Sequence, residues 1–178
     1  MINKLTNTIY IFITTILLSG CFGSNVSPMI QDNYNAAGML IKKAQIDEGT
    51  IVIISTIVDI NDLQNTTALG RTISEQLTSE FVNYGLKMLE MKLGKNVYIK
   101  EHTGELVLSR DITRIANKVK AEVLVAGTYS NTNDLVYINL KIINPKTSII
   151  LSTIDYTLQK DDNIKCLLNE SFLCQEKF

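Results

Sequence analysis

Two runs of β-branched and aliphatic residues constrain the fold of this chain more than any other feature of its sequence. The first run spans residues 50–59 and the second spans residues 122–129, and neither alternates between apolar and polar side chains. A strand that is apolar on both faces needs cover above and below, as the middle strands of a layered sheet have. The chain is therefore predicted to build its core around a sheet with buried central strands.

Segments with helical periodicity lie between and around these runs. Residues 68–84 place an apolar side chain at every fourth position and end at Gly85, which is typical of a left-handed helix C-cap. The stripe consists of Leu69, Ile73, Leu77 and Phe81. Further helices are predicted for residues 33–45 and 109–119, each with apolar residues at helical spacing.

The remaining strand signals are shorter or half-apolar. A strand is predicted over residues 86–93, followed by an irregular hairpin between residues 97 and 108. Residues 136–142 alternate between apolar and polar side chains, as in a half-buried strand. A turn at residues 144–147 leads into an antiparallel partner strand that ends near Leu158. The predicted fold class is α/β (α+β): a mixed β-sheet with helices packed on one face or both, in which two strand–helix–strand passages precede an antiparallel meander.

The first 20 residues have the pattern of a secretory signal. Lys4 supplies a positive charge, an interrupted apolar run covers residues 5–18, and the small residues Ser19 and Gly20 precede Cys21. The apolar run is shorter than the ~20 residues of a transmembrane helix. The pattern predicts cleavage before Cys21, whose thiol then receives diacylglycerol and anchors the chain. An uncleaved anchor, or an ordinary signal followed by a chance cysteine, is the alternative.

The predicted anchor also indicates a membrane and a division of the chain. Phe22 follows the cysteine, and the absence of an Asp there favours the outer membrane over retention in the inner membrane. The predicted parts are a signal peptide (1–20), a lipid-anchored tether (21–33), one α/β domain (34–158) and a C-terminal tail (159–178). Lys and Arg total 17 against 18 Asp and Glu, so nothing indicates binding to nucleic acid.

Two cysteines remain once Cys21 carries lipid. Cys166 and Cys174 both lie in the tail and would be exposed to an oxidising periplasm, where disulfides persist. Their separation permits a small disulfide-closed loop, but spacing alone does not fix the geometry that a disulfide needs. Two alternatives stay open: a disulfide between Cys166 and Cys174, or a pair of free thiols.

No sequence motif indicates catalysis. The chain has neither a glycine-rich nucleotide-binding motif nor a Gly-x-Ser-x-Gly nucleophile elbow. His102 is the sole histidine, and it lies in a segment that reads as a solvated turn, which limits both a Ser-His-acid triad and a histidine zinc site. We therefore expect a protein that is not an enzyme, with no catalytic residues, no cofactor and no bound metal.

Weaker signals each have a structural interpretation beside the functional one. Residues 59–62 carry oxygens that suit a hard cation, but a strand-ending Asx turn is the favoured interpretation. Residues 110–114 could hold an anion or form a solvated helix end with internal ion pairs. Tyr129, Tyr137 and Tyr156 could stack on a sugar or a peptide, although cross-strand packing is the usual role of such residues.

Several segments, in order along the chain, resemble the FlgO family of outer-membrane lipoproteins. They are residues 49–63, 68–77, 106–111 and 123–129, and the most specific piece reads Gly-Arg-x-x-Ser-Glu-Gln-Leu from Gly70 to Leu77. The resemblance covers roughly residues 34–158, and the cysteine-containing tail lies outside it. In this segment Gly70 is expected to let the helix start pack closely, with Arg71 and Glu75 exposed.

The resemblance implies a structural or assembly role in the flagellar apparatus and in motility. Family members lie in the outer membrane near sheath-like or disk-like structures around the motor, so the implied partners are proteins of those structures. The implied fold also occurs in curli-secretion and penicillin-binding-protein-activator lipoproteins. The family has no catalytic residues to carry over.

Alternative functions share the same anchor and fold. One is a lipoprotein that regulates a cell-envelope enzyme such as a peptidoglycan synthase. The predicted tether of roughly 12 residues reaches at most ~40 Å, which disfavours it. Two further alternatives are a curli-secretion-like assembly component and a periplasmic hydrolase that uses His102. Side-to-side contacts through an open edge strand would allow a homo-oligomer.

Overall fold

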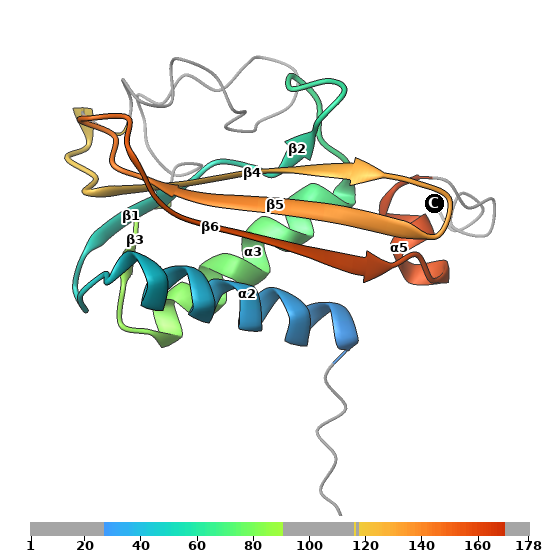
Figure 1. Cartoon of the computed structure of the whole chain (residues 1–178), viewed down its shortest axis with the longest axis horizontal. Helices are drawn as coiled ribbons and strands as arrows, with labels where there is room; N and C mark the ends of the chain where they lie inside the picture. Colours follow the sequence, from blue (N-terminus) through green and yellow to red (C-terminus); the bar gives the residue numbers. More distant parts are fainter. Residues whose placement is uncertain (1–26, 91–115, 117, 170–178) are drawn as a thin grey trace, which may run out of the picture.

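The sheet is mixed, with parallel strands around β1 and an antiparallel meander beyond β4. The computed structural model describes residues 27–90, 116 and 118–169. Its six strands run in the order β3-β1-β4-β5-β6, with β2 also paired to β4 (Figure 1). The bounds are β1 Ile51–Ile54, β2 Val58–Asp59, β3 Lys87–Met88, β4 Val123–Asn131, β5 Leu135–Ile143 and β6 Ile150–Gln159. The predicted mixed sheet and its meander are confirmed.

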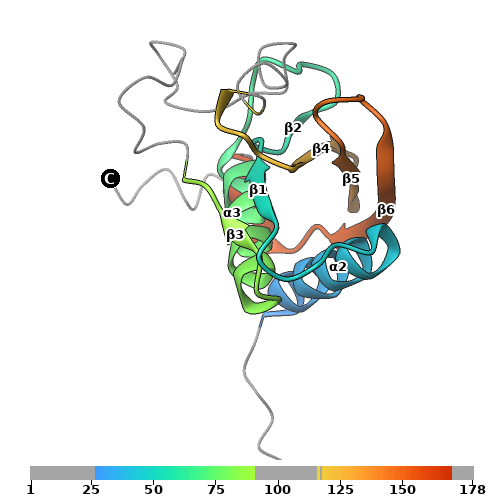
Figure 2. The same cartoon turned by 90° about the vertical axis from the view of Figure 1, so that its left-hand side faces the viewer.

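Two helices pack against one face of this sheet, and the sheet curls around them. Helix α2 spans Pro28–Ala44 and helix α3 spans Ala68–Asn83. Viewed along the strands, the sheet arches from β1 to β6, and α2 and α3 lie within the arch (Figure 2). We call the face toward these helices the inner face and the opposite one the outer face.

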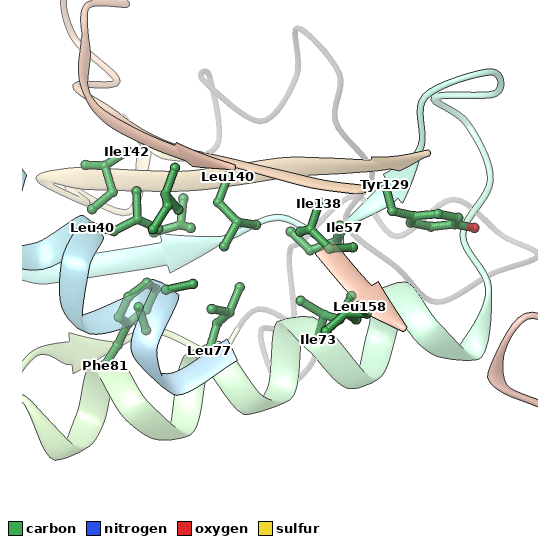
Figure 3. Close-up of a cluster of buried hydrophobic side chains, with 14 of the residues drawn as sticks. Leu40, Ile57, Ile73, Leu77, Phe81, Tyr129, Ile138, Leu140, Ile142 and Leu158 are labelled. Carbon is green, nitrogen blue, oxygen red and sulfur yellow. The ribbon is translucent and has the colours of Figure 1, made fainter. Parts of the chain in front are cut away.

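The inner face and the two helices enclose the main core. The predicted stripe of α3 is fully buried and meets the inward side chains of β5 and β6 (Figure 3). The labelled core residues are Leu40, Ile57, Ile73, Leu77, Phe81, Tyr129, Ile138, Leu140, Ile142 and Leu158. At ~25 cal/mol per Å² of apolar surface, this burial is the main favourable contribution to folding. The periodicity of residues 68–84 therefore predicted the packing face of α3 correctly.

The first apolar run forms two strands instead of the single strand predicted. Ile54 pairs with Val125 and Val58 pairs with Thr128, so this chain advances four residues while β4 advances three. The extra residue is accommodated between β1 and β2, as in a β-bulge. The N–H of Ile57 turns away from the sheet there and donates to the Ser74 hydroxyl of α3 at 3.0 Å.

Helix α2 begins five residues before the predicted start, inside the segment predicted to be tether. Pro28 stands at its first turn, where a missing N–H costs no helical hydrogen bond. Asn33 is fully buried, accepts a hydrogen bond from the Tyr156 hydroxyl and donates to Gln76. This polar contact ties α2 to α3 and β6, so the prediction that residues 28–33 are tether is wrong.

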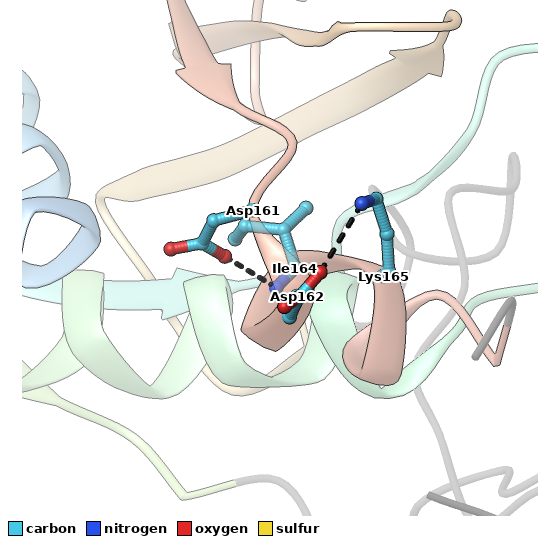
Figure 4. Close-up of polar contacts among 4 residues, drawn as sticks. All are labelled: Asp161, Asp162, Ile164 and Lys165. Carbon is cyan, nitrogen blue, oxygen red and sulfur yellow. Dashed lines mark hydrogen bonds and ion pairs between the residues drawn. The ribbon is translucent and has the colours of Figure 1, made fainter. Parts of the chain in front are cut away.

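The described part of the tail, which the sequence left unassigned, contains helix α5 at Asp162–Leu167. The Asp161 carboxylate caps the helix by accepting the N–H of Ile164 at 2.8 Å, and Lys165 pairs with Asp162 at 3.2 Å (Figure 4). Ile164 and Leu168 are buried in the main core. The α/β domain thus extends beyond residue 158.

Two other predictions are tested only in part. Strand β3 is shorter than the predicted residues 86–93, of which 91–93 lie outside the described residues, as does the predicted hairpin. Of the predicted third helix, Ala116 and Lys118 are helical, and Ala116 packs with Ile53 and Leu124 in a second, smaller core cluster. Helical residues are therefore part of both core clusters, the main one on the inner face and the smaller one around Ile53 and Leu124.

Candidate functional site

The outer face of β4, β5 and β6 carries an open groove. Its volume is about 440 Å³, within the ~300–1,000 Å³ range of small-molecule sites. The groove lies over the second half of β4 and β6 and the first half of β5, where Figure 1 shows α2 and α3 on the opposite side of the sheet. The lining residues are Ile60, Thr128, Ser130, Tyr137, Ile138, Asn139, Asp155, Tyr156 and Thr157.

Strand alternation sets which side chains reach this groove. In β5, Ile138 and Leu140 are buried on the inner face, so Tyr137 and Asn139 point outward. Tyr137 is flanked in register by Ser130 of β4 and Thr157 of β6. The result is an aromatic ring, half exposed at 50%, between two hydroxyl-bearing side chains.

A hydrogen-bonded pair lies next to the ring. Asn139 and Asp155 are register partners, and the Asn139 amide donates to the Asp155 carboxylate. Asp155 is the one lining residue with a formal charge at neutral pH, and no described Lys or Arg pairs with it. Most of the exposed lining surface is apolar, with hydroxyl, amide and carboxylate groups set within it and one formal negative charge on Asp155.

The loop after β2 forms one wall of the groove. Ile60 is 54% exposed, and its N–H donates to the carbonyl of Tyr129 at 2.9 Å, which fixes the loop to β4. The Asp59 carboxylate accepts the Asn61 N–H at 2.8 Å, and Asp62 accepts the Gln64 N–H at 3.1 Å. The predicted Asx turn is confirmed at residues 59–62. No cluster of three or more His, Cys, Asp or Glu suited to a metal ion occurs in the described part of the chain.

The three tyrosines separate into two roles. Tyr129 and Tyr156 both pair in register with Ile138 on the inner face, which confirms cross-strand packing for them. The Tyr129 hydroxyl donates to Thr67 at 3.1 Å, and burial raises the pKa of Tyr129. Burial, helped by the charge of Asp32, raises the pKa of Tyr156. Tyr137 alone of the three presents its ring outward, so stacking on a ligand is an option for that residue.

Comparison with known sequences identifies the family. The sequence profile of the FlgO protein family matches residues 34–163. The chain belongs to the FlgO family. No curated protein sequence matches the chain. The FlgO match includes the start of α5, which the sequence resemblance had placed outside the family pattern.

Solved structures share the fold of this FlgO family chain at low identity. The LpoB C-terminal domain from Salmonella enterica aligns with a TM-score of 0.57 and 12% identity, covering 75% of this chain and 99% of that domain. The LpoB C-terminal domain from Escherichia coli aligns with a TM-score of 0.50 and 15% identity, covering 71% and 98%. At these identities the likeness establishes the shared fold.

The segment that carries the FlgO resemblance is where α3 meets the break between β1 and β2. A Cβ on Gly70 would lie 2.0 Å from the carbonyl oxygen of Ile57, so only glycine allows this approach. Ser74 accepts the N–H of Ile57 and donates to the carbonyl of Gly70 at 2.9 Å. Arg71 and Glu75 are exposed. The predicted close packing of Gly70 is confirmed.

The predicted site residues lie mostly outside the described residues. Cys21, His102, Cys174 and residues 110–114 are among them, so lipidation and the anion-site reading stay predictions. Cys166 lies on α5 and is disulfide-bonded, while its pairing with Cys174 stays a prediction. No described helix is both long and apolar enough to cross a membrane.

Sequence reasoning missed the groove although it singled out Tyr137. The alternation of residues 136–142 places Tyr137 and Asn139 on one face, which is the available signal. Asp155, Thr157 and Thr128 join them only through the register of β4 and β6, and Ile60 only through the loop bond to β4. Pairing register between strands could not be read from one strand's pattern.

Proposed function

We propose that this protein is an outer-membrane lipoprotein, anchored at Cys21, with a structural or assembly role in the flagellar apparatus. The observation that carries the proposal is the FlgO family match across residues 34–163. The signal-like segment ending at Cys21 supports the lipid anchor and envelope location. The role is non-catalytic, and the protein contributes a folded domain that contacts other envelope components.

Anchor and domain are close together in this account. Helix α2 begins at Pro28, so the segment from Cys21 to the domain has about seven residue steps and reaches at most ~25 Å. This is shorter than the reach estimated for a tether ending at residue 33. A domain held this close to the membrane suits assembly at the outer membrane better than regulation of an enzyme in the inner membrane.

Gene deletion with complementation tests the proposal. Cells that lack the gene are expected to swim poorly in soft agar and to show incomplete outer-membrane structures around the motor by electron cryotomography. The wild-type gene should restore both. Normal swimming together with intact motors in the deletion strain would contradict the flagellar role.

Regulation of a peptidoglycan synthase is the competing function, and one further measurement separates the two. The flagellar proposal predicts that the deletion strain keeps wild-type growth and sensitivity to β-lactams while losing motility. Raised β-lactam sensitivity with unchanged motility would favour the regulator instead.

A further inference from the structure

We propose that the outer-face groove binds an N-acetylated glycan, and that its ligand is the glycan strand of peptidoglycan. The choice of this polymer rests on the proposed outer-membrane anchor, with the domain on the periplasmic face of that membrane, whereas the glycan chemistry rests on the groove. The site is centred on Tyr137, with Asp155 and Asn139 beside it and Ile60 at its wall.

The exposed ring is the first observation that favours a sugar. A pyranose ring presents a face of C–H groups that packs on an aromatic ring while its hydroxyls point sideways. Tyr137 is half exposed, and Ser130 and Thr157 lie in register on either side of it. Their hydroxyls can both donate and accept, as sugar hydroxyls require. Ring and hydroxyls together match the two surfaces of a sugar residue.

The polar pair and the wall match the acetamido group in particular. That group carries an N–H donor, a carbonyl acceptor and a methyl group. The Asp155 carboxylate is an acceptor for the N–H, Thr128 and Asn139 can donate to the carbonyl, and Ile60 offers apolar surface to the methyl group. Each part of the acetamido group therefore has a counterpart in the groove.

Charge narrows the class of glycan. The lining residues carry one formal negative charge, on Asp155, and no positive charge. An anionic polysaccharide would be repelled, because no lysine or arginine in the lining offsets its charge. The backbone of peptidoglycan is uncharged where stem peptides are attached to its lactyl groups, which fits this electrostatic character.

A docked peptide is the competing ligand, and the position of the groove disfavours it. Peptides commonly dock on sheets by pairing with the main chain of an edge strand. Strand β5, which carries Tyr137, is paired on one side with β4 and on the other with β6, so its main chain is already used. The open edge of the described sheet nearest to Tyr137 belongs to β6, and a peptide paired there would extend the sheet beside β6 instead of covering the Tyr137 ring on β5. An amphipathic helix would need a continuous apolar stripe, whereas the hydroxyl-bearing Ser130 and Thr157 flank Tyr137 in this lining.

Binding of full-length lipoprotein in detergent to purified, protein-free sacculi tests the inference. The wild-type protein should sediment with sacculi, and soluble N,N′,N″,N‴-tetraacetylchitotetraose should compete. Because the chain has no tryptophan, tyrosine fluorescence can report titration of the same oligosaccharide. Tyr137→Ala should weaken binding roughly tenfold, equivalent to ~1.4 kcal/mol, whereas Tyr137→Phe keeps the ring and should bind nearly as well.

Two further variants complete the design. Asp155→Asn should also weaken binding, because it removes the negative charge and replaces one of the two acceptor oxygens with an NH₂ donor, while Asn139 still occupies the other. Lys141→Ala, outward on the same strand as Tyr137 but outside the lining, should leave binding unchanged. Unchanged binding in both Tyr137→Ala and Asp155→Asn, or no sedimentation of wild type, would overturn the site. Competition by free stem peptide, and not by the oligosaccharide, would assign the groove to a peptide and overturn the glycan.

Failure of the glycan-binding proposal is distinguishable from failure of the proposed flagellar role. The sedimentation assay uses purified components and does not depend on motility. A protein that restores swimming but does not bind sacculi would refute the glycan site alone. Groove-dependent binding of the purified protein to sacculi, together with normal swimming of the strain that lacks the gene, would refute the flagellar role alone.

Discussion

Gly70 occupies the closest approach between α3 and the main chain that precedes it, and its replacement by alanine probes the packing of the FlgO segment. An added Cβ would lie 2.0 Å from the Ile57 carbonyl oxygen and 2.3 Å from the Thr66 hydroxyl. Those two groups hydrogen-bond to each other at 2.7 Å. The methyl group therefore must displace a main-chain carbonyl and also disturb a side-chain bond.

The magnitude follows from three contributions. Overpacking against backbone costs up to ~3 kcal/mol, and loss of the bond from Thr66 to Ile57 costs about 1 kcal/mol. Alanine is favoured over glycine within a helix by at most about 1 kcal/mol. The free energy of unfolding should fall by about 3 kcal/mol. At ~2–4 °C per kcal/mol for a chain of this size, Gly70→Ala should lower Tm by ~6–12 °C.

Thermal unfolding followed by far-ultraviolet circular dichroism measures this shift, with Gly38→Ala as the matched control. A Cβ on Gly38 of α2 would lie 2.5 Å from the hydroxyl of Tyr84, the tip of a partly exposed side chain that can rotate. That variant should change the free energy of unfolding by less than ~1 kcal/mol. A fall in the free energy of unfolding for Gly70→Ala that is no larger than the fall for Gly38→Ala would refute the close packing of Gly70 against Ile57.

Three further substitutions test other contacts. Ser74→Ala should lower the free energy of unfolding by ~1–3 kcal/mol, measured in urea, because the buried N–H of Ile57 loses its acceptor; no change would contradict this. Tyr156→Phe should cost a similar ~1–3 kcal/mol by removing the donor to Asn33. Because burial raises the pKa of Tyr156 above 10.0, the contribution of this tyrosine to the free energy of unfolding is complete below pH 10 and declines above it. Above pH 10 the Phe variant should therefore lose stability less steeply than the wild type, and parallel stability curves would contradict this. Asp161→Ala should cost about 1 kcal/mol by removing the cap of α5, seen as faster hydrogen exchange in that helix, and unaltered exchange would contradict it.

The core was largely predictable because it depends on periodicity within single segments. The four-residue spacing from Leu69 to Phe81 determines one face of a helix whatever lies against it. The apolar run at residues 50–59 likewise identified the central strands. Its break could not be seen, since the extra residue exists only relative to the pairing of β4 with β1 and β2. The start of α2 was missed because Pro28, a helix-start residue, lies among small polar residues that also suit a tether.

The groove was less predictable because it is assembled across strands. Alternation places Tyr137 outward, and the spacing of Ile154, Tyr156 and Leu158 places Tyr156 inward, so part of the separation of tyrosines was accessible. The contact of Asn139 with Asp155 needed the register of β5 and β6, which the turn at residues 144–149 sets. The buried role of Asn33 likewise depends on partners far away in sequence.

The proposed function depends most directly on Cys21 as the anchor of a flagellar lipoprotein. In a strain that lacks the native gene, cells expressing wild type or Cys21→Ala can be fractionated and scored for swimming in parallel. Wild-type protein is expected in the outer-membrane fraction, with swimming restored. Cys21→Ala protein is expected to be absent from that fraction, with swimming still impaired. Cys21→Ala protein that stays in the outer membrane, or that restores swimming fully from elsewhere, would contradict it.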